Sequence, residues 1–200
     1  MKKRISTVWI VLGVIVALIV IIGLWINSSY SGMVDRQEQV QESWAQVENV
    51  YQRRADLIPN LVATVKGYAS HEKETLEGVV NARAKATQVS INANDLSEAN
   101  IKKYQEAQGQ LSQALGKLLM LTENYPDLKA NQNFMALQAQ LEGTENRITV
   151  ERQKFNTTAR AYNTYIRKFP TNMIAGMFGF ERRGYFEAKE GAEEAPKVEF

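Results

Sequence analysis

The sequence predicts an all-α protein in which an N-terminal transmembrane helix precedes an elongated antiparallel bundle of three to four long helices. Two patterns carry this prediction. Near the N-terminus the apolar residues are uninterrupted, as in a membrane-spanning helix. Beyond residue 40 they recur every three or four residues, which is the spacing of one helical face. Because no segment alternates apolar and polar residues, we expect almost no β-structure.

Residues 8–26 form the apolar segment. All 19 are uncharged, and 14 of them are Val, Ile or Leu. A helix of this length covers about 28 Å, close to the hydrocarbon thickness of a bilayer. Trp9 and Trp25 lie near its ends, where indole rings favour the interface. The alternative is a cleaved signal peptide, but Trp25, Ile26 and Asn27 stand where a small-residue cleavage site would lie. The prediction is therefore an uncleaved anchor.

The charges beside this segment predict its orientation. Lys2, Lys3 and Arg4 precede it, whereas Arg36 is the one basic residue in the twenty that follow. Basic residues favour the cytoplasmic side of a membrane. We therefore expect residues 1–7 in the cytoplasm and the helical domain outside it.

A short polar joint, residues 27–36, separates the anchor from the predicted bundle domain, residues 37–180. The domain opens with a long apolar stripe that contains Pro59. Proline removes a backbone hydrogen bond and clashes with the preceding turn, so we expect a kink or break between residues 56 and 60. The stripe comprises Val40, Trp44, Val47, Tyr51, Ala55, Ile58, Val62, Val65, Ala69, Leu76, Val79 and Val80.

Two further helices follow in the sequence. After an Asn-rich loop, Asp95 and Glu98 have the spacing of an N-terminal capping box. This second helix should end before Pro126, because the residue before a proline avoids the helical conformation. The third helix begins near Asn131 and stops before Pro170.

The C-terminal part divides in two. Residues 171–180 are apolar and small, and they either pack back on the bundle or touch lipid. Residues 181–200 include an acidic stretch with little to bury, which predicts a mostly disordered tail.

Composition excludes several kinds of site. With no cysteine there are no disulfides or thiolate ligands. The net charge is +2, and the first four residues carry three positive charges, so the remainder is close to neutral and nucleic-acid binding is not supported. The one histidine, His71, has no second histidine or cysteine with which to hold zinc. We expect no metal, no cofactor and no catalytic residues.

Two groups of polar residues interrupt the helical stripes. One surrounds Pro59 and the other lies between the inward Leu141 and Ile148. In antiparallel helices the two groups could meet, either as a polar layer that fixes the helix register or as a docking site. The candidates are Arg54, Asp56, Asn60, Glu145, Asn146 and Arg147.

Several longer motifs are distinctive and follow one another along the chain. They are Arg53-Arg54-Ala55-Asp56-Leu57-Ile58-Pro59-Asn60-Leu61-Val62, Thr64-Val65-Lys66-Gly67-Tyr68, His71-Glu72, Tyr125-Pro126-Asp127-Leu128-Lys129-Ala130, Gly143-Thr144-Glu145-Asn146-Arg147-Ile148, Tyr162-Asn163, Phe169-Pro170-Thr171-Asn172, Ile174-Ala175 and Phe178-Gly179-Phe180. These motifs resemble those of the LemA family of bacterial membrane proteins, and the likeness covers residues 8–187. The resemblance implies a bacterial membrane-anchored helical bundle with no known enzymatic activity and no agreed active site. Some relatives are associated with magnetosome membranes.

Two functional hypotheses follow. The first is a non-catalytic scaffold or partner-binding protein in the bacterial cytoplasmic membrane, whose partners are the lipid bilayer and either another envelope membrane protein or further copies of itself. The second is a sensor or enzyme that binds a small ligand or cell-wall fragment at the polar group around Pro59 and His71. The second hypothesis requires these side chains to converge on one concave pocket.

Overall fold

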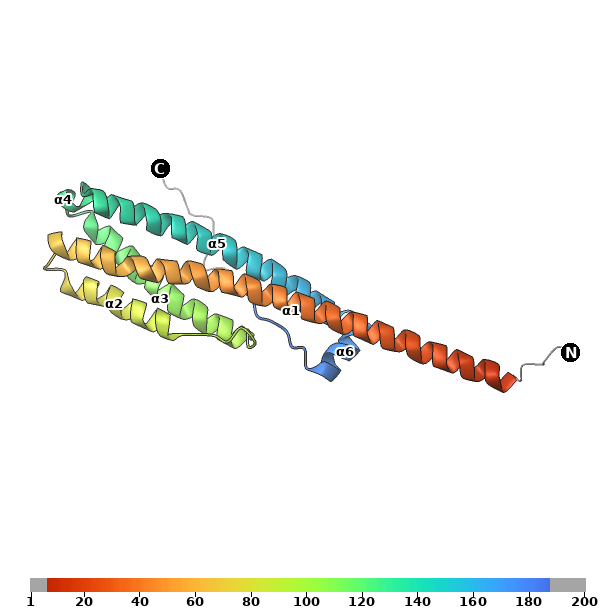
Figure 1. Ribbon diagram of the computed structural model, residues 1–200. Helices are drawn as coiled ribbons and strands as arrows, with labels where there is room; N and C mark the ends of the chain where they lie inside the picture. Colours follow the sequence, from red (N-terminus) through yellow and green to blue (C-terminus); the bar gives the residue numbers. More distant parts are fainter. Residues whose placement is uncertain (1–6, 188–200) are drawn as a thin grey trace, which may run out of the picture. The chain divides into compact units, whose positions relative to one another are not determined.

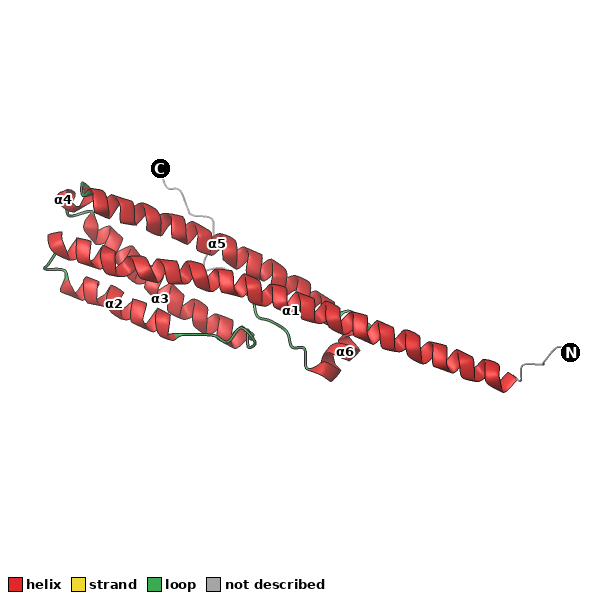
Figure 2. Ribbon diagram, viewed as in Figure 1, coloured by secondary structure: helices red, strands yellow, loops and turns green. Residues whose placement is uncertain are grey.

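The computed structural model describes residues 7–187, and every regular element in this part of the chain is a helix (Figures 1 and 2). The predicted all-α class is therefore confirmed. The predicted cytoplasmic residues 1–6 and the tail residues 188–200 lie outside the described residues. The helices are α1 (Thr7–Tyr68), α2 (Lys73–Gln88), α3 (Glu98–Thr122), α4 (Pro126–Lys129), α5 (Gln132–Arg167) and α6 (Thr171–Phe178).

The chain divides into two compact units. Unit 1 comprises Met1–Gln39 and Arg160–Arg182, and unit 2 comprises Val40–Ala159 and Arg183–Phe200. Helices α1 and α5 therefore each contribute residues to both units.

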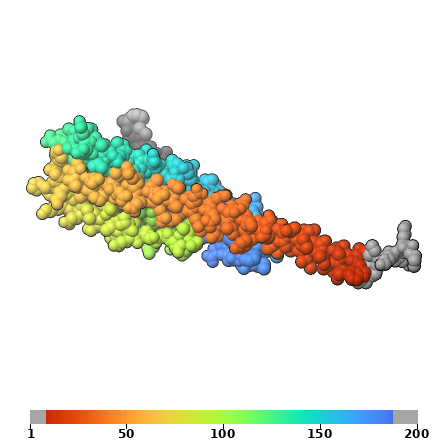
Figure 3. Space-filling model, viewed as in Figure 1, coloured from red at the N-terminus to blue at the C-terminus, as the bar shows by residue number. Residues whose placement is uncertain are grey.

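Unit 1 contains the apolar anchor. Among the described helices, α1 alone is long and apolar enough to cross a membrane. The side chains of residues 9–24 are exposed, as is expected of a surface that faces lipid (Figure 3). The helix continues without interruption through the polar residues 27–36, so the predicted joint is helical.

Polar and aromatic contacts hold the rest of unit 1 together. The Arg36 guanidinium lies 3.9 Å from the centre of the Tyr165 ring and donates to the carbonyl of Gly32. Tyr162 donates to the Glu181 carbonyl over 3.0 Å. A side chain at Gly32 would collide with Tyr165, because an added Cβ would lie 2.6 Å from the phenol oxygen. Glycine at this position thus leaves room for the Tyr165 ring beside α1.

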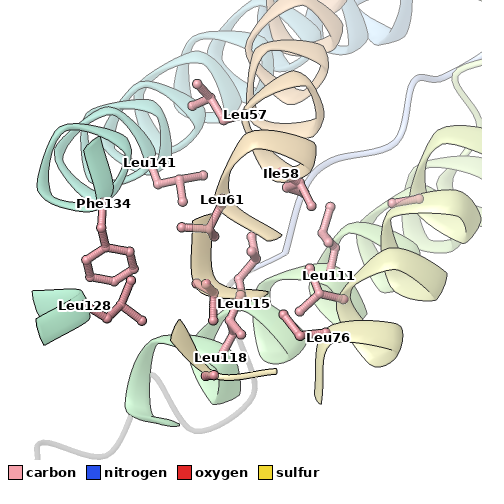
Figure 4. Close-up of a cluster of buried hydrophobic side chains, with 14 residues drawn as sticks. Leu57, Ile58, Leu61, Leu76, Leu111, Leu115, Leu118, Leu128, Phe134 and Leu141 are labelled. Atoms are coloured by element: carbon pink, nitrogen blue, oxygen red, sulfur yellow. The ribbon is translucent and has the colours of Figure 1, made fainter. Parts of the chain in front are cut away.

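Unit 2 is built from four principal helical segments: residues 40–68 of α1, α2, α3 and residues 132–159 of α5. Helices α1 and α5 are antiparallel, since Arg53 bonds to Gln140 while Tyr68, further along α1, bonds to the earlier Asn131. Their apolar stripes meet in one core (Figure 4). The core residues are Leu57, Ile58, Leu61, Val65, Ala69, Leu76, Val79, Ala86, Leu111, Leu115, Leu118, Leu128, Phe134 and Leu141.

Of the two predicted alternatives at Pro59, the break is wrong, because α1 is helical on both sides of this residue, and the kink stays a prediction. Proline has no N–H, so the carbonyl four residues earlier, that of Ala55, lacks its helical donor. Arg83 of α2 replaces this donor: its Nε lies 2.8 Å from the Ala55 oxygen. The helix tolerates Pro59 because a neighbouring helix satisfies the orphaned carbonyl.

The long first stripe is divided between two helices. Helix α1 ends at Tyr68, and α2 begins at Lys73 with Leu76 and Val79 buried against the same core. The stripe therefore continues, but the chain turns between its two parts.

The predicted start of α3 is wrong in its capping residue, whereas the predicted start of α5 is confirmed. The predicted Asp95 cap is wrong: Ser97 is the N-cap residue, and its hydroxyl accepts from the Asn100 N–H. Serine is as good a cap as aspartate, so the sequence allowed either residue. Helix α5 begins just after Asn131, as predicted, and the Asn131 side chain accepts from the Phe134 N–H over 3.0 Å.

Residues 183–187 pack on unit 2 even though the sequence places them in the tail. Phe186 is buried, and its backbone N–H and carbonyl both bond to the Asn156 side chain over 2.8 Å. The Gly184 N–H donates to the Leu96 carbonyl, also over 2.8 Å. We name residues 183–187 the C-terminal strap.

Substituting Gly184 with alanine should release this strap. An added Cβ would lie 2.7 Å from the Cα and 2.9 Å from the N of Glu98, and this backbone at the start of α3 cannot yield. Overpacking of this kind costs about 1–3 kcal/mol. We expect trypsin to cleave beside the strap faster in Gly184→Ala than in the natural protein. Mass spectrometry of the digest measures this rate. Gly116→Ala is the control, because no atom beyond the adjacent backbone of its own helix lies within 4 Å of the added Cβ. Equal cleavage of the two variants would contradict the prediction.

Candidate functional site

A buried arginine organises the most polar region of unit 2. The Arg54 side chain, on α1, is 2% exposed, and its Nη1 donates to the Ser112 hydroxyl over 2.8 Å and to the Glu145 carboxylate over 3.0 Å. Its Nη2 donates to the Gln108 side-chain oxygen over 2.6 Å. The Arg54 guanidinium therefore links α1 to both α3 and α5.

The acidic partner of this arginine is closer to solvent. The Glu145 side chain is 46% exposed, so water can hydrate the carboxylate as well. Arg54 Nε is buried and has no hydrogen-bond partner within the described residues. Because burial of a cation costs less free energy when most of its hydrogen bonds are made, the bonds to Ser112 and Gln108 support the buried guanidinium together with the ion pair.

Of the six residues singled out in the sequence, the structure brings two together, Arg54 and Glu145. Asp56 is exposed and accepts from Gln52 on its own helix. Asn60 is exposed as well, and its carbonyl accepts from the Thr64 hydroxyl. Asn146 and Arg147 are also exposed on α5. Only part of the suggested polar layer therefore forms.

The α3 members of this cluster, Gln108 and Ser112, were not among the residues predicted from the sequence. Gln108 is buried, and its amide also donates to the Ala86 carbonyl of α2 over 3.3 Å. It stands in the inward stripe of α3, four residues after Tyr104 and three before Leu111. A polar residue at a stripe position is a signal that could have identified it.

Beside this cluster unit 2 has an open cleft of about 880 Å³. Helix α3 forms much of its wall, and α1, α5 and the C-terminal strap supply the rest. The lining residues are Tyr51, Arg54, Glu98, Lys102, Gln105, Glu106, Gln108, Gly109, Gln110, Ser112, Gln113, Glu145, Arg152, Tyr185 and Glu187. This lining combines acidic and basic side chains with several glutamine amides. It therefore offers both hydrogen-bond donors and acceptors, and neither sign of charge dominates.

Two buried tyrosines adjoin the polar cluster: the centre of the Tyr51 ring lies 5.0 Å from the Arg54 guanidinium and 5.3 Å from that of the Tyr104 ring. Burial raises the pKa of Tyr51 above its usual 10.0, although the nearby Arg152 and Arg54 partly oppose this. Burial likewise raises the pKa of Tyr104, and the neighbouring Tyr51 and Glu48 add to the effect. Both phenols are therefore neutral at physiological pH and act as hydrogen-bonding groups, not as anions.

The arrangement required by the small-ligand hypothesis is not seen in the described residues. His71 is exposed, and neither it nor Asp56 nor Asn60 lines the cleft. The described part of the chain also contains no group of three or more His, Cys, Asp or Glu side chains placed to hold a metal ion. What the cleft presents is a surface for hydrogen bonding and charge pairing.

Comparison with known proteins identifies relatives. The LemA family model matches residues 43–200. Magnetosome protein MamQ 2 of Paramagnetospirillum magneticum and magnetosome protein MamQ of Magnetospirillum gryphiswaldense are each 27% identical over 177 residues, with 80% of this chain covered. Protein LemA of Metamycoplasma hominis is 24% identical over 154 residues, with 77% of this chain and 67% of that protein covered. The chain spans 65% of the length of the two MamQ proteins. None of these names denotes an enzymatic activity.

Proposed function

Because this chain belongs to the LemA family, we propose that it is a membrane-anchored helical scaffold of the bacterial cell envelope, which binds a partner protein and catalyses no reaction. The observation that carries the proposal is the open polar cleft built around Arg54. The apolar part of α1 supports the membrane attachment. The three basic residues at the N-terminus favour a cytoplasmic N-terminus and a helical domain outside the cytoplasm, in the bacterial inner membrane.

The chemistry of the cleft suits a polar segment of another protein. Lys102 and Arg152 supply cations, Glu98 and Glu106 supply anions, and the glutamines of α3 both donate and accept. Pairing of opposite charges gives such an interface its specificity and register. The occupant that we propose is a segment of another envelope membrane protein, and a second copy of this chain is the other outcome to be distinguished.

Photo-crosslinking in intact cells tests this proposal. A photoreactive amino acid would be placed at Gln110 or Gln113, which line the cleft and are exposed. The matched control is Glu77, an exposed residue of α2 that does not line the cleft. We expect one defined adduct from the two cleft positions and none from Glu77. Mass spectrometry then separates an adduct with another protein from an adduct between two copies.

Reversal of two charges in the cleft provides a second test of partner binding. Lys102→Glu combined with Glu106→Lys keeps the net charge but inverts the local pattern, so the adduct from Gln113 should fall at least several-fold. Equal adduct yields with and without the reversal, or no adduct from either cleft position, would overturn the proposal.

A further inference from the structure

One face of α6 is apolar and uncovered within unit 1. Met173 and Met177 are four residues apart and lie on one side of α6, and Phe169 lies in the turn that precedes this helix. Together with Phe178 they are between 53% and 80% exposed. The opposite side of α6 buries Ile174 and Ala175. Large apolar side chains grouped on one face of a short helix mark an interaction surface.

Contacts at the C-terminal end of α6 place this helix close to the exit of the anchor. The Tyr30 ring lies 5.1 Å from the ring of Phe178 and 5.6 Å from that of Phe180, both edge-on. Figure 3 shows α6, in blue, against α1 just beyond the red apolar segment. Tyr30 follows the last apolar residue, Ile26, by four positions, which is about 6 Å along a helix. The headgroup layer of one leaflet is roughly as deep, so Tyr30 and its partners fall within it.

The charges around α6 also suit a membrane surface. In residues 160–182 the basic side chains outnumber the acidic one, and Arg167 and Lys168 directly precede Phe169. Both of these are exposed. Cations flanking an apolar face favour contact with anionic lipid headgroups. The basic residues are Arg160, Arg167, Lys168 and Arg182, and the acidic one is Glu181.

We propose that α6, with Phe169, lies in the headgroup region of the bilayer that α1 crosses, as a second and interfacial membrane contact of the chain. The apolar face would then insert beside the anchor, while Ile174 and Ala175 keep α6 packed within unit 1. The apolar face of an interfacial helix reaches about 5–10 Å into this boundary, so large side chains such as Met173 and Met177 would insert there. This inference rests on the membrane anchoring included in the proposed function.

Quenching by labelled lipid tests the proposal on the full chain. The natural sequence has no cysteine, so single substitutions Met173→Cys and Met177→Cys accept a bimane fluorophore at one site each. The labelled proteins are reconstituted into phosphatidylglycerol-containing vesicles whose acyl chains are brominated just below the headgroup. Trp25→Cys reports on the anchor, and Glu77→Cys, on α2, reports on a position remote from lipid.

We expect quenching at Met173→Cys and Met177→Cys that approaches the value at Trp25→Cys and is several-fold above that at Glu77→Cys. Quenching at the level of Glu77→Cys, with Trp25→Cys still quenched, overturns the interfacial contact and leaves the anchor intact. A blue-shifted but unquenched bimane also overturns it, since this result means that protein covers the face. If Trp25→Cys is itself unquenched, the anchor fails and the inference falls with it.

Discussion

Trp44→Ala should destabilise unit 2 by about 3–5 kcal/mol, the usual loss when a large buried aromatic side chain is removed. The Trp44 side chain is fully buried. Its ring centre lies 5.1 Å from that of Tyr104, 5.5 Å from that of Phe155 and 6.0 Å from that of Phe186. Removal of the indole therefore loosens α1, α3, α5 and the C-terminal strap together. Urea unfolding of the full chain in detergent micelles, followed by circular dichroism, measures the loss.

Trp25→Ala is the matched control for this substitution. Trp25 is partly exposed near the end of the apolar segment, so its removal should leave the urea midpoint of unit 2 unchanged. Trp44→Phe should cost less than Trp44→Ala, because a smaller cavity remains. A midpoint for Trp44→Ala within error of the natural protein would mean that the aromatic cluster does not hold these segments together.

Arg54→Ala should cost about 3 kcal/mol of stability, the low end of the range for breaking a buried ion pair. The substitution removes the guanidinium that joins α1 to Ser112, Gln108 and Glu145, and it leaves the buried Gln108 oxygen without its donor. Glu145 is half-exposed, so water can hydrogen-bond to its carboxylate in place of Arg54. This limits the loss of stability. Urea unfolding of the same full-length preparation measures the effect.

Two further variants sharpen this prediction. Arg53→Ala removes a neighbouring but exposed arginine, whose bond to Gln140 is long at 3.4 Å, so it should change stability by less than about 0.5 kcal/mol. Glu145→Gln keeps a hydrogen-bond acceptor but leaves the Arg54 charge uncompensated, and we expect a loss of about 1–2 kcal/mol. If Arg53→Ala proves as costly as Arg54→Ala, the buried network is not what stabilises this region.

The fold was predictable from the sequence wherever a local pattern determines it. The stripe spacing predicted helices, and Asn131 marked the start of α5 correctly. The break at Pro59 was mispredicted because the donor that replaces its missing N–H comes from Arg83, on another helix. The packing of residues 183–187 was missed for a similar reason: Phe186 and Gly184 meet partners that are distant in sequence.

The candidate site shows the same division between local and tertiary information. Arg54 and Glu145 were conspicuous as charges next to apolar stripes, and the structure joins them. Asp56 and Asn60 were equally conspicuous around Pro59, yet they face solvent. Ser112 was not identified because nothing local distinguishes one hydroxyl on α3 from the others. Each of these residues joins the cluster only if its side of the helix faces the other helices. The spacing of residues in the sequence does not reveal which helices pack against that side.

The bond from Arg83 to the Ala55 carbonyl makes the geometry of one helix depend on another. A change that detaches α2 would strip α1 of its substitute donor, and the chain would then be free to bend at Pro59. The docking of α2 therefore keeps α1 hydrogen-bonded through the turn that contains Pro59, because Arg83 supplies the donor that the proline lacks.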